Sequence, residues 1–256
     1  MDINKSHAIV TGGSSGLGGA TVDLIIKSGG KATILDVQED KANEKVSLHG
    51  SSSCQFFNAD VSDEKLVQNV IEDSIKHFGP IQLAVNCAGI GIAKKISGRK
   101  GVHDLSSYKR VIEVNLVGTF NVLKTCAEKM QNNNPDVDGG KGVIVNTASV
   151  AAYDGQIGQA AYSSSKGGIV GLTLPAAREL ATSGIRVCTI APGLFETPMM
   201  AGLPEAAKQS LIESTLFPKR LGLPEEFAKL VLSIYENNML NGETIRLDGS
   251  LRMAPN

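Results

Sequence analysis

The chain has 256 residues, of which 42% are hydrophobic and 20% are charged, and its formal net charge is −1. This balance is typical of a globular protein and excludes an extended disordered chain. The near-zero charge gives no general attraction to nucleic acid or to an anionic membrane, and no apolar run reaches the roughly 18 residues that a membrane span needs. We therefore expect neither a nucleic-acid partner nor a membrane partner.

The cysteines and the first residues bear on the compartment. Cys54, Cys87, Cys126 and Cys188 are widely spaced in apolar or helical surroundings, which favours buried reduced thiols over a metal cluster. The chain runs at once into a strand-like segment at 7–10, without an apolar signal-peptide region or an Arg-rich transit segment. We expect no metal site, and a reducing compartment such as a bacterial cytoplasm or a mitochondrial matrix.

Short apolar runs rich in β-branched residues alternate along the chain with longer amphipathic stretches. The predicted strands are 7–11, 32–36, 53–59, 83–86, 142–148, 185–191 and 244–247. The predicted helices are 17–28, 64–78, 105–131, 158–182 and 224–237. Right-handed crossovers join such elements into an α/β Rossmann fold: a doubly wound, mostly parallel seven-stranded sheet with helices on both faces. Since no repeat or linker divides it, we expect a single domain over 1–256.

Two longer segments interrupt this alternation. Residues 91–102 form a basic loop that carries Lys94, Lys95, Arg99 and Lys100. Residues 194–223 contain several prolines and glycines between apolar residues. Because long loops in compact domains are usually functional or mobile, we expect 194–223 to be a mobile substrate lid.

A glycine-rich turn, TGGSSGLG, follows the first predicted strand. The spacing of Gly12, Gly16 and Gly18 suits a tight turn, close backbone approach to a pyrophosphate and close packing of helix on strand. The helix that follows offers free N–H groups and its positive dipole end to phosphates. A plain turn is the alternative, but the place at the first strand–helix junction favours a dinucleotide site.

Asp36 ends the second predicted strand, 18 residues beyond Gly18. A carboxylate there can accept both ribose hydroxyls of an adenosine and repels a 2′-phosphate. No basic residue follows Asp36 directly, and the glycine loop holds Ser14 and Ser15 where a basic residue could stand. We therefore expect NAD rather than NADP, with a helix N-cap as the alternative role of Asp36.

The third and fourth predicted strands also end in segments suited to the adenosine half of a dinucleotide. These segments are Asp60-Val61 and Asn86-Cys87-Ala88-Gly89. Ligands of a doubly wound sheet lie at the carboxyl ends of its strands. Asp60 as the cap of the next helix stays open as an alternative.

Tyr162 and Lys166 stand at i and i+4, on one face of a predicted helix, and Ser149 lies just past a predicted strand. A free tyrosine, with a pKa of about 10, is a poor base at neutral pH. Lys166 and a cationic nicotinamide both favour phenolate, so we expect the pKa of Tyr162 to fall. Ser149 can then bond the substrate oxygen while Tyr162 moves its proton. This set predicts hydride transfer between a secondary alcohol or ketone and a nicotinamide.

Over nearly its whole length the chain resembles the short-chain dehydrogenase/reductase family. TGGSSGLG is similar to that family's cofactor loop, NCAG to its structural turn, and Ser149, Tyr162 and Lys166 to its catalytic triad. The resemblance implies that Asn115 completes a tetrad by holding a water that links Lys166 to a proton relay. It also implies that Gln156 lies near the substrate.

The glycine loop, the strand ends and this resemblance together give one set of expected cofactor-binding residues. They are Gly12, Ser14, Ser15, Gly16, Leu17, Gly18, Asp36, Asp60, Val61, Cys87, Ala88, Gly89, Tyr162, Lys166, Pro192, Gly193, Phe195 and Thr197.

Four stretches, 146–162, 166–175, 190–197 and 245–253, resemble the branch of the family that acts on 3-hydroxyacyl-CoA. That likeness implies NAD-linked oxidation of short-chain or branched 3-hydroxyacyl-CoA to 3-oxoacyl-CoA, some activity on other secondary alcohols or steroids, and a homotetramer. The basic loop could receive the phosphates of coenzyme A or be simply solvated. Two other functions stay open: a 3-oxoacyl carrier-protein reductase, and an NAD-binding scaffold for a protein or RNA partner.

Overall fold

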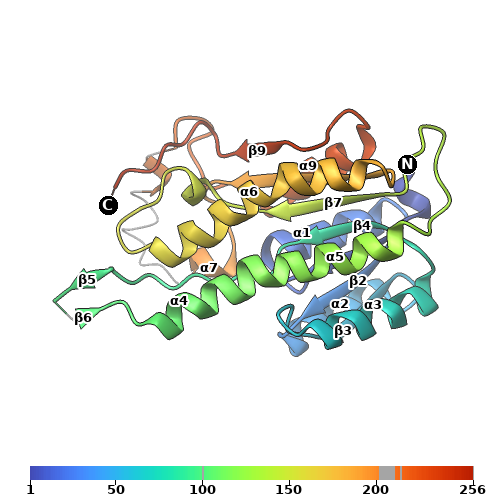
Figure 1. The fold of residues 1–256 in the computed structure, drawn as a ribbon, viewed down its shortest axis with the longest axis horizontal. Helices are drawn as coiled ribbons and strands as arrows, with labels where there is room; N and C mark the ends of the chain where they lie inside the picture. Colours follow the sequence, from blue (N-terminus) through green and yellow to red (C-terminus); the bar gives the residue numbers. More distant parts are fainter. Residues whose placement is uncertain (100, 202–210, 214, 256) are drawn as a thin grey trace.

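The computed structural model describes residues 1–99, 101–201, 211–213 and 215–255. Its centre is a seven-stranded sheet in the order β3-β2-β1-β4-β7-β8-β9, in which every neighbouring pair is parallel (Figure 1). The strands are β1 (His7–Thr11), β2 (Lys31–Asp36), β3 (Cys54–Asn58), β4 (Ile81–Asn86), β7 (Gly142–Thr147), β8 (Ile185–Pro192) and β9 (Thr244–Leu247). The predicted fold class is confirmed. The strand order reverses between β1 and β4, which is where such sheets bind ligands.

Helices cover both faces of the sheet. The helices are α1 (Gly16–Lys27), α2 (Glu39–His49), α3 (Glu64–Phe78), α4 (Leu105–Ile112), α5 (Gly118–Met130), α6 (Ala160–Ala181), the short α7 (Pro198–Ala201) and α9 (Pro224–Glu236). Val10 of β1 packs with α1 and α9 on one face, whereas its neighbour Ile9 packs with α3 and α5 on the other. Because the central strands β1, β4, β7 and β8 are buried on both faces, their sequences are nearly continuous apolar runs.

The predicted helix 105–131 is interrupted. Between α4 and α5 the backbone widens into a π-helical segment, η2 (Glu113–Val117), which contains the buried Asn115. Such wide turns inside helices frequently mark functional sites. Gly118 at the end of this segment packs so tightly that a Cβ there would lie 2.4 Å from Cγ2 of Val61.

The two irregular segments are only partly described. Within the basic loop, β5 (Ser97–Gly98) and β6 (Gly101–Val102) form a small antiparallel hairpin that stands away from the main sheet (Figure 1). Lys100 and the lid residues 202–210 and 214 lie outside the described residues. In the part of the chain that is described, no helix is long and apolar enough to cross a membrane, and no cluster of side chains is suited to a metal ion.

Candidate active site

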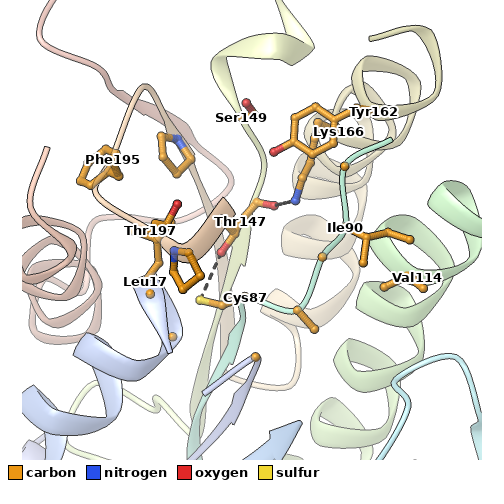
Figure 2. A pocket seen from close by; sticks show the side chains of 18 of the residues that line it. Leu17, Cys87, Ile90, Val114, Thr147, Ser149, Tyr162, Lys166, Phe195 and Thr197 are labelled. Atoms are coloured by element: carbon orange, nitrogen blue, oxygen red, sulfur yellow. Dashed lines mark hydrogen bonds between the residues drawn. The ribbon is translucent and has the colours of Figure 1, made fainter. Parts of the chain in front are cut away.

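A cavity of about 630 Å³ lies at the carboxyl ends of the central strands and is shared by the glycine loop and the end of α6 that carries Tyr162. Every residue expected to bind the cofactor lines it, except Ser14. Ser149 lines it too, whereas Asn115 and Gln156 are not among the lining residues. The topology therefore brings strand ends that are far apart in the sequence to one site (Figure 2).

The glycine loop has the shape that a pyrophosphate requires. Gly12 and Gly16 have positive φ values of 63° and 53°, which favour glycine. A Cβ at position 12 would lie 2.9 Å from the backbone nitrogen of Ala88, and one at position 18 would lie 2.3 Å from the carbonyl oxygen of Gly12. The N-cap of α1, Ser15, makes no side-chain capping bond, so the first N–H groups of the helix are left for a ligand. These residues fit a dinucleotide.

Asp36 lines the cavity with a carboxylate that the chain holds in place. The backbone N–H and the hydroxyl of Ser14 donate to Oδ2 of Asp36 at 3.1 and 2.5 Å, and the N–H of Gln38 donates to Oδ1 at 3.0 Å. Ser14 is buried behind this carboxylate and does not line the cavity. The structure thus places Ser14 as a residue that orients Asp36.

Asp60 lies at the cavity with Arg110, which the sequence did not indicate. Nη2 of Arg110 donates to Oδ2 of Asp60 at 2.8 Å, and the N–H and hydroxyl of Ser62 donate to Oδ1 at 3.0 and 2.7 Å. Burial opposes ionisation of Asp60, but these hydrogen bonds outweigh it and lower its pKa to about 2. The N-cap of α3 is Asp63, whose side chain accepts from the N–H of Leu66 at 3.0 Å, so Asp60 is not the helix cap.

Ser149, Tyr162 and Lys166 meet at the other end of the cavity. Tyr162 and Lys166 extend from one face of α6, and Nζ of Lys166 lies 5.7 Å from the centre of the Tyr162 ring (Figure 2). Nζ also donates to the carbonyl oxygen of Thr147 at 2.7 Å. Ser149 follows β7 in extended backbone, and its hydroxyl accepts from the N–H of Ala151 at 3.1 Å.

Burial dominates the acid–base properties of this group. It raises the pKa of Tyr162 above its usual value, with the Ser149 hydroxyl acting in the opposite direction. It also lowers the pKa of Lys166 to about 8. In the protein alone the pKa of Tyr162 does not fall, because desolvation of the phenolate is the largest influence on it. The expected fall also depends on a cationic nicotinamide and stays a prediction for the complex with the cofactor.

The side chain of Asn115 connects the segment after β4 to α6 through hydrogen bonds. Its Oδ1 accepts from the N–H of Ile90 at 2.8 Å, and its Nδ2 donates to the Ile90 carbonyl at 2.9 Å and to Oγ of Ser165 at 3.0 Å. A Cβ at Gly89 would lie 3.3 Å from Oδ1 of Asn115 and 3.6 Å from Nζ of Lys166, so Asn115 and Lys166 are near neighbours. Both amide hydrogens of Asn115 are engaged. A water linking Asn115 to Lys166 would have to donate to an oxygen of Asn115.

The segment after β8 forms the wall opposite α6. Pro192, Gly193, Phe195 and Thr197 line the cavity. A Cβ at Gly16 would lie 3.5 Å from Cγ2 of Thr197, so this segment reaches across to the glycine loop. The residues around Thr197 therefore lie against the glycine loop at one end of the cavity.

Sequence reasoning missed several lining residues on the Tyr162 side, among them Gln159 and Met253. Gln159 precedes Tyr162 by one helical turn, and that spacing could have identified it. Gln156, expected near the substrate, donates instead through Nε2 to the carbonyl oxygen of Ala254 at 3.0 Å. No sequence pattern pointed to Met253, which reaches the cavity only because the chain turns back after β9.

The sequence matches the family described as short chain dehydrogenase over residues 6–208. The chain belongs to the short-chain dehydrogenase family. Membership implies an oxidoreductase with a nicotinamide cofactor and a small-molecule substrate, as the motifs predicted.

Individual relatives cover nearly all of this short-chain dehydrogenase. A 3-hydroxyacyl-CoA dehydrogenase type-2 from Drosophila melanogaster is 52% identical over 255 residues, which is 99% of this chain and 100% of that protein. The protein of the same name from Homo sapiens is 52% identical over 250 residues, 97% of this chain and 95% of its own. The crystal structure of a 3-hydroxyacyl-CoA dehydrogenase type-2 from Mycobacterium avium superposes with a TM-score of 0.92 at 38% identity, covering 98% of this chain and 97% of that one.

Proposed function

We propose that this short-chain dehydrogenase oxidises short-chain or branched 3-hydroxyacyl-CoA to 3-oxoacyl-CoA with NAD, and accepts other secondary alcohols or steroids as further substrates. The observation that carries the proposal is that Ser149, Tyr162 and Lys166 line the same cavity as the glycine loop. The near-complete coverage by relatives named 3-hydroxyacyl-CoA dehydrogenase type-2 supports the choice of substrate.

The proton chemistry belongs to three side chains. Ser149 donates a hydrogen bond to the hydroxyl oxygen of the substrate, and Tyr162 takes the proton of that hydroxyl as the carbonyl forms. Lys166, close to Tyr162, stabilises the phenolate. The chemistry supplied by bound NAD is acceptance of the hydride from the carbinol carbon. The glycine loop would hold its pyrophosphate, and the segment from Pro192 to Thr197 its nicotinamide.

Asp36 supports NAD over NADP. Its carboxylate faces the cavity and is fixed by Ser14 and by the N–H of Gln38. A fixed carboxylate accepts ribose hydroxyls well and repels the 2′-phosphate of NADP. This also argues against the carrier-protein reductase, which in this family usually uses NADPH. Assays that compare acyl-CoA with acyl carrier protein separate the two.

The basic loop supports recognition of coenzyme A only in part. Lys94 bonds to Asp104, which neutralises one of its cations. Lys95 and Arg99 are exposed in the basic loop and are the described cations that we assign to the phosphates of coenzyme A. Replacing both with Ala should raise KM for the thioesters and leave KM for small CoA-free alcohols unchanged. An equal effect on both substrate classes would refute this assignment.

We propose further that residues 1–256 form one catalytic domain with a lid at 194–223, and that the protein is a homotetramer. Phe120 of α5 and Leu174 of α6 are large apolar side chains that stand about half exposed on the outer helices. Apolar side chains in such positions are suited to burial between subunits. Sedimentation velocity at several protein concentrations tests the assembly, and a monomer throughout would contradict it.

The deciding experiment measures NADH formation with a panel of 3-hydroxyacyl-CoA esters, steroids and simple alcohols. We expect Tyr162→Phe to lower kcat roughly 100- to 10,000-fold, because the general base is lost. Tyr108→Phe is the matched control, since Tyr108 lies outside the cavity lining. A Tyr162→Phe protein that keeps its activity would contradict the mechanism, and one that keeps full cellular function without turnover would favour the scaffold.

A further inference from the structure

The last described residues lie against the loop that separates Ser149 from α6. The N–H of Ile157 donates to the carbonyl oxygen of Pro255 at 2.9 Å, and Nε2 of Gln156 donates to the carbonyl oxygen of Ala254 at 3.0 Å. We call residues 251–255 the C-terminal segment. It continues from the end of β9 on the side of the molecule where α6 begins (Figure 1).

Arg246 of β9 holds this arrangement together. Its Nη2 donates to Oδ2 of Asp154 at 2.5 Å and to the carbonyl oxygen of Leu251 at 2.9 Å, and its Nε donates to Oδ2 of Asp248 at 2.6 Å. The guanidinium also lies 5.2 Å from the centre of the Tyr153 ring. One side chain thus joins β9, the loop after Ser149 and the C-terminal segment by charge-assisted hydrogen bonds, which are the strong kind.

Between these anchors, Met253 lines the cavity. Its companions there include Val150, Ala151 and Gln159, all from the stretch between Ser149 and Tyr162. Met253 is half-buried, while its neighbours Arg252 and Ala254 are exposed. The segment therefore points one apolar and adaptable side chain inward, at the end of the cavity where the substrate must lie.

We propose that Met253 closes the acyl end of the substrate cavity and sets the acyl length that the enzyme accepts, and that Arg246 is the positioning residue that keeps it there. The inference rests on the proposed oxidation of 3-hydroxyacyl-CoA, because it places the acyl chain on the Ser149–Tyr162 side of the cavity. A wall set by one flexible side chain is adjustable, since one methylene in an apolar pocket changes discrimination by about 10- to 200-fold.

The test measures kcat/KM from 3-hydroxybutyryl-CoA to 3-hydroxyoctanoyl-CoA, and from 2-butanol to 2-octanol, at saturating NAD. Met253→Ala should raise the long-to-short ratio by about tenfold, because it opens space for further methylenes. Met253→Phe should lower the same ratio. Met239→Ala is the matched control, since Met239 is 90% exposed and lies outside the cavity lining, and it should leave the ratio at the wild-type value.

Arg246 is tested through the same ratio, which a general loss of stability would not move. Arg246→Ala should shift the long-to-short ratio in the direction of Met253→Ala, and Arg246→Lys should restore it only partly, because lysine cannot make the paired bonds. Adding Arg246→Ala to Met253→Ala should shift the ratio no further, since both changes remove the same wall.

The measurements distinguish a failure of the proposed function from a failure of the roles given to Met253 and Arg246. Failure of the wild-type protein to oxidise any thioester would overturn the proposed function, and the alkanol series would then measure the chain-length ratio. A ratio that stays the same in Met253→Ala and Met253→Phe, on the substrates that the wild type turns over, would overturn the role of Met253. A ratio unchanged in Arg246→Ala would overturn the role of Arg246.

Discussion

At the scale of single residues, burial and hydrogen bonds together set the pKa values of the groups that carry the proton chemistry. Desolvation disfavours the charged forms of Tyr162 and Lys166, which raises the pKa of Tyr162 and lowers that of Lys166. Ser149 counteracts this effect at Tyr162. Burial therefore opposes the phenolate that oxidation requires, while Lys166, with a pKa of about 8, still carries most of its charge at neutral pH.

A pH dependence follows from this. The phenol of Tyr162 must lose its proton to act as base, and burial raises its pKa, so kcat/KM for oxidation at saturating NAD should keep rising with pH above neutrality. Ser149→Ala should move the rising limb to higher pH, because the hydroxyl that lowers the pKa of Tyr162 is gone. The pH profiles of both proteins check this. Profiles that are flat, or that coincide in position, would contradict it.

Cofactor preference should follow the charge at Asp36 and its orientation by Ser14. Asp36→Asn removes the charge that repels a 2′-phosphate, so the kcat/KM ratio of NAD to NADP should fall by about tenfold or more. Ser14→Ala keeps the charge and removes only the 2.5 Å hydrogen bond, so it should change the ratio less. Initial rates with both cofactors measure the effect. A wild-type preference for NADP would refute the choice of NAD.

At the scale of elements, most helices and strands could be predicted from the sequence because each has a clear hydrophobic pattern. The predicted bounds of β1, β9 and α3 coincide with the structure, since apolar runs and a well-formed N-cap mark their ends. The helix α2 was missed because its residues are mostly exposed, with only Ala42 fully buried. The π-helical segment was missed because a widened turn leaves no mark on helical periodicity, and its stabilising contact, Asn115 to Ile90, joins residues 25 positions apart.

The same reasoning explains which parts of the candidate site were predictable. Residues at strand ends and in the glycine loop are placed by the topology of the sheet, so their place at the cavity follows from the sequence. Arg110 and Met253 come from segments that pack against the site only in three dimensions. Ser14 does not line the cavity but bonds to Asp36, and nothing in the sequence distinguishes a residue that touches a ligand from one that holds its neighbour.

The π-helical segment should depend on the amide of Asn115. Asn115→Ala leaves the half-buried N–H and carbonyl of Ile90 without this partner, which should lower the free energy of unfolding by about 1–3 kcal/mol. Asn238→Ala, which removes an exposed amide bonded to Asp138, should change it by less than about 0.5 kcal/mol. Urea denaturation compares the two. Equal free energies for wild type and Asn115→Ala would show that the segment does not need the amide.

At the scale of the whole molecule, the chemistry and an important stabilising contact lie at different places in the sheet. The cavity is at the carboxyl ends of the strands, whereas Arg186, the second residue of β8, bonds to the end of α9. Its guanidinium donates to the carbonyl oxygens of Ile234, Tyr235 and Leu240 at 2.7 to 2.8 Å. Stability and activity should therefore be separable.

Arg186→Met should lower the free energy of unfolding by about 2–4 kcal/mol, because buried carbonyl groups lose charged donors. The KM values for NAD and substrate should stay at the wild-type values, since Arg186 does not line the cavity. Arg178→Met, on the exposed side of α6, is the control and should change neither quantity. Thermal unfolding and steady-state kinetics check both parts. A KM that rises with the loss of stability would show that the two are coupled.

Finally, Arg246 stands on β9, the outermost strand of the sheet, whose residues are only half covered within one chain. The side chain of Arg246 stays 21% exposed, and its guanidinium also fixes the loop after Ser149. If neighbouring copies meet there, dilution of the protein should loosen that loop and alter which acyl chains react fastest, without any change in sequence. The preference of each subunit for an acyl length would then depend on the subunits that it contacts.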